Sequence, residues 1–356
     1  MRITSWAMQA AGQPLVPDVR DEEPRAGEVL IEVAGCGVCH TDLGFYYDGV
    51  PTRHALPLCL GHEISGKVIA TGAGAETWRD RLVIVPAVLP CGECTACKAG
   101  RGSICPKQIF PGNDVHGGFA SHVRVPARGL CPVPDLGLAA RNPLGLELWM
   151  LAVIADAVTT PYQAILRSGL ARGDLAVFVG AGGVGGFGVQ IAHALGAKVV
   201  ALDVSQERLT LAGEHGAALT LRPDQLEFKD LRKQLKAFAQ QQGIPGFRWR
   251  IFETSGTPRG QETAFGLLEH GAYLSVVGFT PEKVTLRLSN LMAFDATVQG
   301  NWGCLPEHYP AVLDLVLAGK VAIEPFITRR PLASINEVFG DLHARKLNQR
   351  VVLVPE

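Results

Sequence analysis

The sequence lacks several features that would each point to a particular class of protein. Lys and Arg together number 33 against 34 Asp and Glu, a net charge of -1, so no general attraction to nucleic acid or to an anionic membrane is expected. The opening residues MRITSWAMQAAG have neither the basic start nor the apolar core of a signal peptide, and no uninterrupted apolar stretch approaches the roughly 20 residues that cross a bilayer. Internal repeats and low-complexity tracts are also absent. We therefore expect a soluble, cytoplasmic protein without nucleic-acid or membrane partners.

The 356 residues are many for one hydrophobic core, and the pattern along the chain changes accordingly. Short apolar runs separated by Gly, Pro and Asp predict an irregular β domain in the first half, with strands near 29–33, 64–70, 81–85 and 119–125. Farther along, strands near 175–179, 198–203, 218–221, 250–253 and 272–277 alternate with helices near 184–195, 206–215, 227–242 and 260–269. This alternation predicts a parallel sheet covered on both faces. Helices near 306–318 and 334–346 and a strand at 350–354 complete the chain.

A glycine-rich turn in the second pattern predicts a dinucleotide site. The segment VFVGAGGVGGFG places Gly180, Gly182 and Gly185 after an apolar strand and at the start of a helix, and Asp203 follows at the end of the next strand. Glycines let the backbone approach a pyrophosphate, which the helix N-terminus attracts. Asp203 would bind the adenosine ribose and disfavour a 2′-phosphate, so NAD is expected rather than NADP. A glycine turn in a non-binding α/β domain is the alternative.

Nine cysteines are present, and four of them lie within the segment PCGECTACKAGRGSICP. The spacing of Cys91, Cys94, Cys97 and Cys105 suits a closed tetrahedral zinc site, with Zn–S distances of about 2.3 Å. Four protein ligands leave no open position, so the predicted role is structural. A redox dithiol, an iron–sulfur cluster and a nucleic-acid-binding zinc ribbon are the alternatives.

Two further segments, GCGVCHTD and LGHEISG, supply Cys39 and His62, which is one ligand short of a catalytic zinc site with three protein ligands. Elsewhere, LWMLAVIADAVTTPYQAIL holds a single charged residue, Asp156. A carboxylate in so apolar a run is expected to be paired, protonated, helix-capping or bound to a metal.

These motifs, with DAVTTPYQAI, stand in the order and approximate spacing of the zinc-dependent medium-chain alcohol dehydrogenases, which the whole chain resembles. The resemblance implies an α/β protein: a GroES-like, β-rich catalytic domain at 1–156 with a structural zinc lobe at about 88–108, a Rossmann doubly wound parallel-sheet domain at 157–300, and a return to the catalytic domain at 301–356. It also implies two zinc ions per chain, NAD, and a homodimer or homotetramer.

The resemblance further implies roles for individual residues. Cys39, His62 and Asp156 would hold the catalytic zinc, with Glu63 behind them or as a transient ligand, while Asp42 would orient His62. Thr41 would take the proton of the substrate hydroxyl as hydride passes to the nicotinamide. The positions that match cofactor contacts are His40 and Arg350 at the pyrophosphate, the turn Gly180, Gly182, Gly183, Val184 and Gly185, then Asp203 with Arg208 at the ribose, and Val277, Gly278 and Phe279 at the carboxamide.

One position departs from the family pattern, because Gly44 stands where many members have the histidine that ends the proton relay. His54, Tyr46, Tyr47 or water are the candidates to replace it.

The stretches FYYDGVPTRHALPLCLGHEISG and FRWRIFETSGT resemble the branch that oxidises 6-hydroxycyclohex-1-ene-1-carbonyl-CoA to the 6-oxo compound in anaerobic aromatic degradation. The substrate would then be an acyl-CoA thioester, with Arg53, Lys98 and Arg101 as candidate partners for its phosphates. The alternatives are a zinc alcohol dehydrogenase acting on a non-CoA alcohol, a 1,4-reductase of enones or enoyl thioesters, and a regulatory zinc protein.

Overall fold

The computed structural model describes all 356 residues and divides them into two compact units. The first, the catalytic unit, contains Met1–Thr159, Gly303–Gly319 and Ile323–Glu356. The second, the Rossmann unit, contains Thr160–Trp302 and Lys320–Ala322. The catalytic unit is therefore discontinuous in sequence, and the Rossmann unit is nearly continuous.

The catalytic unit is built mainly from antiparallel strands. Its strands are β1 (Arg2–Met8), β2 (Val16–Asp21), β3 (Glu28–Gly37), β4 (Leu58–Cys59), β5 (Glu63–Thr71), β6 (Leu82–Val85), β7 (His122–Pro126), β8 (Cys131–Val133), β15 (Ile327–Pro331) and β16 (Arg350–Val354). A small sheet has the order β2-β1-β4, and a larger one runs β15-β16-β3-β5-β6-β8, with β7 paired to β3. The last strand of the chain thus pairs with β3 near the start, through Val352 opposite Gly37 and Leu353 opposite Cys36.

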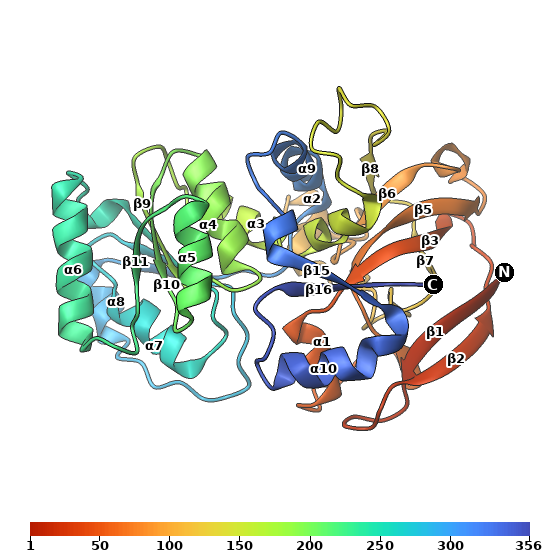
Figure 1. Cartoon of the computed structure of the whole chain (residues 1–356), viewed down its shortest axis with the longest axis horizontal. Coiled ribbons are helices and arrows are strands. Elements are labelled where there is room, and N and C mark those ends of the chain that lie inside the picture. Colours follow the sequence, from red (N-terminus) through yellow and green to blue (C-terminus); the bar gives the residue numbers. More distant parts are fainter. The chain divides into compact units, whose positions relative to one another are not determined.

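The helices of the catalytic unit are short. They are α1 (His40–Tyr46), α2 (Thr95–Lys98), α9 (Tyr309–Leu317), α10 (Ile335–His343) and the 3₁₀ helices η1 (Glu76–Trp78), η2 (Gly102–Ile104), η3 (Leu148–Ala155), η5 (Pro306–His308), η6 (Glu324–Phe326) and η7 (Leu332–Ser334). The helix α3 (Thr159–Arg167) begins at the last residue of the segment Met1–Thr159, and its other residues belong to the Rossmann unit. Figure 1 shows α10 beside α1, where Tyr46 packs edge-on against Phe339. One buried core of strand residues underlies these elements.

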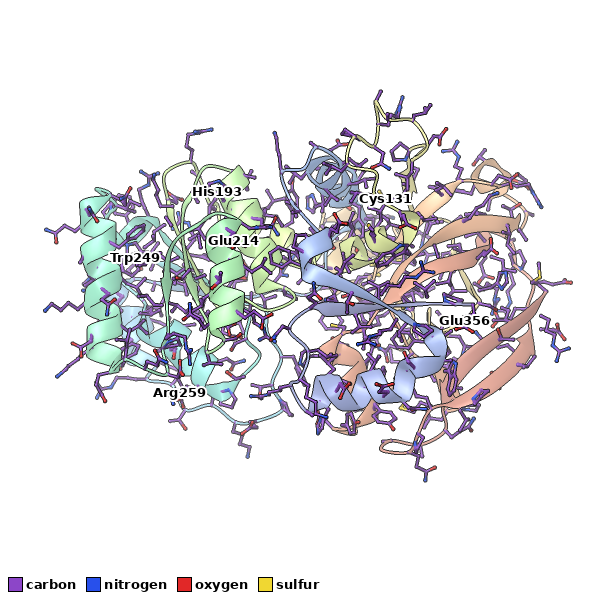
Figure 2. The ribbon with its side chains drawn as sticks, in the orientation of Figure 1. Cys131, His193, Glu214, Trp249, Arg259 and Glu356 are labelled. Atoms are coloured by element: carbon purple, nitrogen blue, oxygen red, sulfur yellow. The ribbon has the colours of Figure 1, made fainter.

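The Rossmann unit contains one six-stranded parallel sheet. Its strands are β9 (Leu175–Val179), β10 (Lys198–Leu202), β11 (Ala217–Leu221), β12 (Trp249–Glu253), β13 (Tyr273–Val276) and β14 (Thr297–Gly300), in the spatial order β11-β10-β9-β12-β13-β14. Its helices are α4 (Gly185–Ala194), α5 (Gln206–Glu214), α6 (Phe228–Gln241), α7 (Pro258–Gly266), α8 (Ser289–Phe294) and η4 (Gly246–Arg248). Figure 1 shows α4 and α5 side by side on the sheet, and Trp249, labelled in Figure 2, is buried in its core. The strand order reverses between β9 and β12, which is where such sheets bind dinucleotides.

These observations confirm the predicted fold class, a GroES-like β-rich domain with a Rossmann domain. One helical stretch, Leu148–Arg167, is long and apolar enough to cross a membrane by length and composition alone, although no such stretch was expected from the sequence. The most apolar 18 residues of this stretch are 72% buried inside the protein. Core helices pass the same test, and this stretch is accounted for by the core it helps to form.

Candidate functional site

Four predicted site residues meet at one point of the catalytic unit. Cys39 precedes α1, His62 and Glu63 stand at the start of β5, and Asp156 follows η3. Their ligand atoms lie within 4.8 Å of one another. The Asp156 carboxylate lies 3.9 Å from the Cys39 sulfur and 3.6 Å from His62 Nε2. Ligands of one tetrahedral zinc ion are separated by about 3.4–3.8 Å, so this spacing fits the metal.

Asp42 holds the two ligand-bearing segments together. Its carboxylate is buried, with Oδ2 accepting a hydrogen bond from the Cys39 amide at 3.0 Å and Oδ1 accepting one from the Gly61 amide at 3.1 Å. The same Oδ1 lies 3.4 Å from His62 Nδ1. One carboxylate therefore positions the residue that carries the thiolate, the turn before the imidazole, and the imidazole itself.

The chemistry of this group favours a bound cation. His62 is 1% exposed, and neither of its ring nitrogens makes a hydrogen bond in the protein, which costs free energy unless a metal is coordinated. Burial lowers the pKa of His62, but the carboxylates of Asp42 and Asp156 more than offset this, so the pKa is raised well above its ordinary value. The pocket thus attracts positive charge, which zinc on Cys39, His62 and Asp156 would supply.

Glu63 and Arg350 form a buried pair behind these ligands. The Arg350 guanidinium donates to Glu63 Oε1 at 2.5 Å and to the carbonyl of Val38 at 3.4 Å, and neither side chain is more than 6% exposed. Burial raises the pKa of Glu63 and the charge of Arg350 opposes that rise. Arg350 is predicted from the resemblance to contact the pyrophosphate. In the structure its side chain is committed to Glu63, so that role stays a prediction.

The four clustered cysteines converge around the short helix α2. The Cys94 sulfur lies 3.5 Å from that of Cys97 and 3.7 Å from that of Cys105, and the sulfurs of Cys91 and Cys97 are 3.9 Å apart. A zinc ion with Zn–S bonds of about 2.3 Å separates its sulfurs by about 3.8 Å, which matches. Amides of Glu93 and Cys94 lower the pKa of the Cys91 thiol to about 6, which favours the thiolate that a metal requires.

In the Rossmann unit, the glycine turn joins β9 to α4. Gly180 has a φ of +101°, and a Cβ at Gly185 would lie 1.8 Å from the Gly180 carbonyl oxygen, so both positions require glycine. Asp203 Oδ2 accepts from the Ala181 amide at 2.7 Å and Oδ1 from the Ser205 amide at 2.8 Å. Arg208 lies 4.0 Å from the same carboxylate. Asp203 therefore joins the glycine turn to the start of α5, a contact that sequence reasoning missed.

The remaining cofactor positions lie as follows. Gly182, Gly183 and Val184 form the turn before α4, and His40 is the exposed first residue of α1. The amides of Val277 and Gly278 donate to the carbonyl of Glu253 at 2.9 Å each, and Phe279 is 62% exposed. Glu253 was not predicted as a site residue. Its buried carboxylate also accepts from the Ser255 and Gly256 amides, so it organises the loop after β12.

The candidate relay residues have other partners. Tyr46 packs on Phe339, and Tyr47 stacks on His343 with ring centroids 4.0 Å apart. His54 lies 4.8 Å from the ring of His116. Thr41 Oγ1 is 3.8 Å from the Cys39 sulfur, which places that hydroxyl beside the ligand group.

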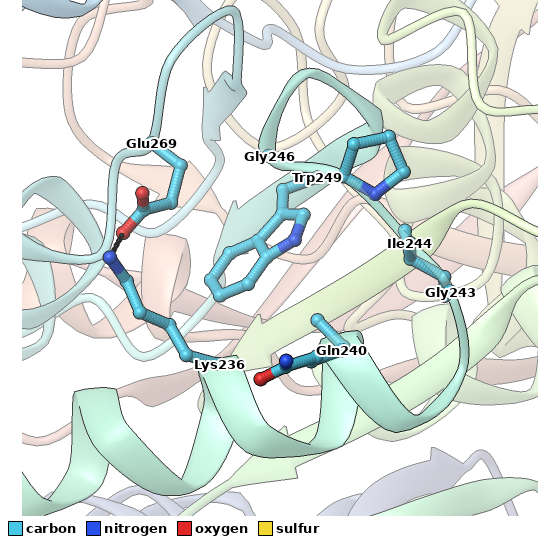
Figure 3. Close-up of a pocket in the computed structure, with 9 residues that line it drawn as sticks. Lys236, Gln240, Gly243, Ile244, Gly246, Trp249 and Glu269 are labelled. Atoms are coloured by element: carbon cyan, nitrogen blue, oxygen red, sulfur yellow. Dashed lines mark ion pairs between the residues drawn. The ribbon is translucent and has the colours of Figure 1, made fainter.

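One cavity lies away from every predicted site residue. It has a volume of about 550 Å³ and is formed around the end of α6 and the start of β12. Figure 3 shows Trp249 in this cavity, with the ion pair between Lys236 and Glu269 at its edge. None of the metal or cofactor candidates lines it.

Comparisons with known proteins identify the family of the chain. Residues 25–135 match the alcohol dehydrogenase GroES-like domain family, and residues 183–318 match the zinc-binding dehydrogenase family. An alcohol dehydrogenase from Geobacillus stearothermophilus is 31% identical over 341 residues, covering 95% of this chain and 94% of that protein. L-threonine 3-dehydrogenase from Pyrococcus furiosus is 31% identical over 318 residues, covering 86% of this chain and 85% of that protein.

Solved structures agree in fold along the whole chain. An alcohol dehydrogenase from Thermotoga maritima superposes with a TM-score of 0.87 at 26% identity, covering 100% of both chains. Galactitol-1-phosphate dehydrogenase from Escherichia coli superposes with a TM-score of 0.85 at 26% identity, covering 99% of this chain and 100% of that chain.

Proposed function

Because the chain belongs to the zinc-dependent medium-chain alcohol dehydrogenases, with two zinc ions and NAD as cofactors, we propose that it oxidises a secondary, cyclic allylic alcohol. The observation that supports this reaction is the convergence of Cys39, His62 and Asp156 with the Thr41 hydroxyl beside them. Two relatives are named for oxidation at position 3 of L-threonine and position 5 of galactitol 1-phosphate, both of which carry secondary hydroxyl groups.

The residues of this group would have separate roles in the reaction. Cys39, His62 and Asp156 would hold the zinc ion, which would supply a positive charge that lowers the pKa of the substrate hydroxyl toward neutral. Thr41 would accept that proton and pass it toward the nicotinamide ribose, while Asp42 keeps His62 oriented. The bound nicotinamide would supply the hydride acceptor, and the overall reaction would convert the alcohol and NAD to the ketone, NADH and a proton.

For the substrate we propose 6-hydroxycyclohex-1-ene-1-carbonyl-CoA, oxidised to 6-oxocyclohex-1-ene-1-carbonyl-CoA in anaerobic aromatic degradation. The support is the likeness of the segments around His62 and Glu253 to that branch of the family. A CoA ester needs cations near its phosphates, and Arg53, Lys98 and Arg101 are exposed. Arg53 also pairs with Asp114 at 3.2 Å.

The test compares NADH formation with this thioester, with the free acid and with 2-cyclohexen-1-ol. We expect kcat/KM to be at least about 100-fold higher for the thioester, equivalent to about 2.7 kcal/mol of extra transition-state binding. Equal values for all three alcohols would instead identify a dehydrogenase of non-CoA alcohols.

The reverse reaction tests the 1,4-reductase alternative. Reduction of the 6-oxo thioester by NADH gives the allylic alcohol by 1,2-addition or the saturated ketone by 1,4-addition. Because these products have the same mass, the vinylic proton signal or chromatography against standards must distinguish them. The saturated ketone as main product would overturn the proposal.

The metal ligands have their own test. We expect Asp156→Ala to lower bound zinc from about two ions per chain to about one and to abolish turnover while the fold persists. Unchanged zinc content and activity would refute Asp156 as a ligand.

We also propose that the protein is a homodimer or homotetramer that pairs through β14, an edge strand of the Rossmann sheet. Leu288, Met292 and Val298 on and near this edge are 66%, 79% and 37% exposed. An unpaired edge with apolar neighbours favours pairing with a second copy. Light scattering should therefore show an oligomer that Met292→Lys weakens, and a monomeric parent would contradict this.

A cytoplasmic location fits the cysteine chemistry, since none of the nine cysteines forms a disulfide and zinc-binding thiols must stay reduced.

A further inference from the structure

Tyr309, the first residue of α9, is fully buried and contacts the end of η3, the helix that precedes Asp156. Its hydroxyl donates a short hydrogen bond to the carbonyl of Ala155 and accepts one from the amide of Ala87 at 3.2 Å. All these residues belong to the catalytic unit. The phenol thus contacts the main chain immediately before a predicted metal ligand, and it has no role in the reaction described above.

The C-terminal end of η3, at Ala155, needs hydrogen-bond donors from other segments of the chain. η3 is a 3₁₀ helix of eight residues, longer than most, and the last carbonyls of any helix have no partner within it. Asp156 then leaves the helix with φ -144° and ψ -56°. The Ala155 carbonyl receives the Tyr309 hydroxyl and, at 3.3 Å, the Ala87 amide. These bonds fix the point at which the chain turns.

The direction of the Asp156 side chain follows from that point. The peptide between Ala155 and Asp156 is planar, so holding its oxygen also holds the nitrogen and Cα of Asp156. On the other side of Asp156, its carbonyl accepts the Thr159 hydroxyl at 3.5 Å. The backbone of Asp156 is therefore held before and after the residue, while its carboxylate reaches toward Cys39 and His62.

We propose that Tyr309 is a positioning residue of the catalytic zinc site, which acts by fixing the peptide that carries Asp156. The proposal rests on the ligand set proposed above. Burial raises the pKa of Tyr309 well above its ordinary value, so the phenol keeps the proton that it donates. A ligand held in place before the metal binds loses less entropy on coordination, and removal of such outer partners typically lowers metal affinity about 10–100-fold.

The test is the rate at which zinc leaves the loaded enzyme for an excess of chelator. Tyr309→Phe removes only the hydroxyl, and Tyr273→Phe is the matched control, since its hydroxyl donates to Gln299 in the Rossmann unit. Each of the two zinc ions is expected to leave in its own kinetic phase, and the phase that is missing in Asp156→Ala is assigned to the catalytic zinc. We expect that phase to be at least about 10-fold faster in Tyr309→Phe, with the four-cysteine phase and the control unchanged.

A second measurement distinguishes positioning from general stability. With cobalt in the catalytic site, the visible absorption bands of Tyr309→Phe should shift, because they report the arrangement of the ligands. Release kinetics and a cobalt spectrum like those of the parent would overturn the proposal while leaving Asp156 a ligand. If instead Asp156→Ala kept both zinc ions, the ligand set itself would be wrong. Should Tyr309→Phe fail to fold, Thr159→Val decides the question by the same two readouts.

Discussion

Replacing Asp42 by Asn should destabilise the catalytic unit more than its small chemical change suggests. The carboxylate is buried and uses one oxygen for the Cys39 amide and the other for the Gly61 amide, with His62 Nδ1 3.4 Å away. An asparagine has one acceptor oxygen in place of two. Its NH₂ group must therefore face one of the two amides, so that one donor loses its partner and the remaining bond loses its charge.

The size of the effect follows from these contacts. Losing a charge-assisted hydrogen bond costs about 1.5–3 kcal/mol, and a buried N–H without a partner costs about 1–3 kcal/mol. We expect a total of about 3 kcal/mol, taking the lower part of the summed range because the site can relax. For a unit of roughly 200 residues, about 2–4 °C of Tm is lost per kcal/mol, so the expected decrease is about 6–12 °C.

Calorimetry of the zinc-saturated protein would measure this decrease, with bound zinc determined on the same samples. Asp48→Asn is the control, since Asp48 follows the same helix and is exposed. A Tm for Asp42→Asn that matches the control, with both zinc ions retained, would show that the Asp42 contacts do not hold the site together.

Three further predictions test other parts of the molecule. Gly185→Ala should weaken NAD binding by at least about 10-fold in calorimetric titration, because its Cβ would lie 1.8 Å from the Gly180 carbonyl oxygen, whereas Gly213→Ala, with 3.9 Å to its nearest neighbour, should bind normally. Cys94→Ser should lose one zinc ion and lower the Tm while the other ion stays, and a full zinc content at the parental Tm would contradict the structural role. Burial lowers the pKa of His116 to about 4. Between about pH 6.5 and pH 4 the imidazole is therefore protonated in the unfolded chain but not in the folded protein, so the free energy of unfolding decreases as the pH falls. The expected decrease is about 1–2 kcal/mol after allowance for solvent screening. Urea unfolding at several pH values should show a shallower decrease in His116→Asn, and parallel curves would refute the assignment.

Much of the fold could be predicted because apolar runs and turn residues are local signals. The strands Leu175–Val179 and Arg350–Val354 have the predicted bounds. β14 was missed because TVQG is short, polar and at the edge of the sheet, where a strand needs little apolar surface. β2 was missed because much of it is exposed.

The site was predictable only in part. Cys39 and His62 stand in recognisable motifs, but Asp156 follows Cys39 by 117 residues, and nothing in its spacing links the two. The resemblance supplied that link. The roles of Tyr309 and of the pair between Glu63 and Arg350 depend on contacts that only the folded chain creates. Glu253 did carry a local signal, a carboxylate at the end of an apolar strand, which is the same signal that marked Asp203.

The pairing of β16 with β3 has a consequence for how the protein is made. The Rossmann unit is nearly continuous and precedes β16, so it can fold before β16 is synthesised. The sheet behind the metal ligands cannot close until β16 emerges, because β16 supplies both a strand beside β3 and the arginine that neutralises Glu63. Until then Glu63 lacks the arginine that pairs with it in the folded chain. The proposed zinc ligands Cys39, His62 and Asp156 are therefore all synthesised before the arginine that lies behind them.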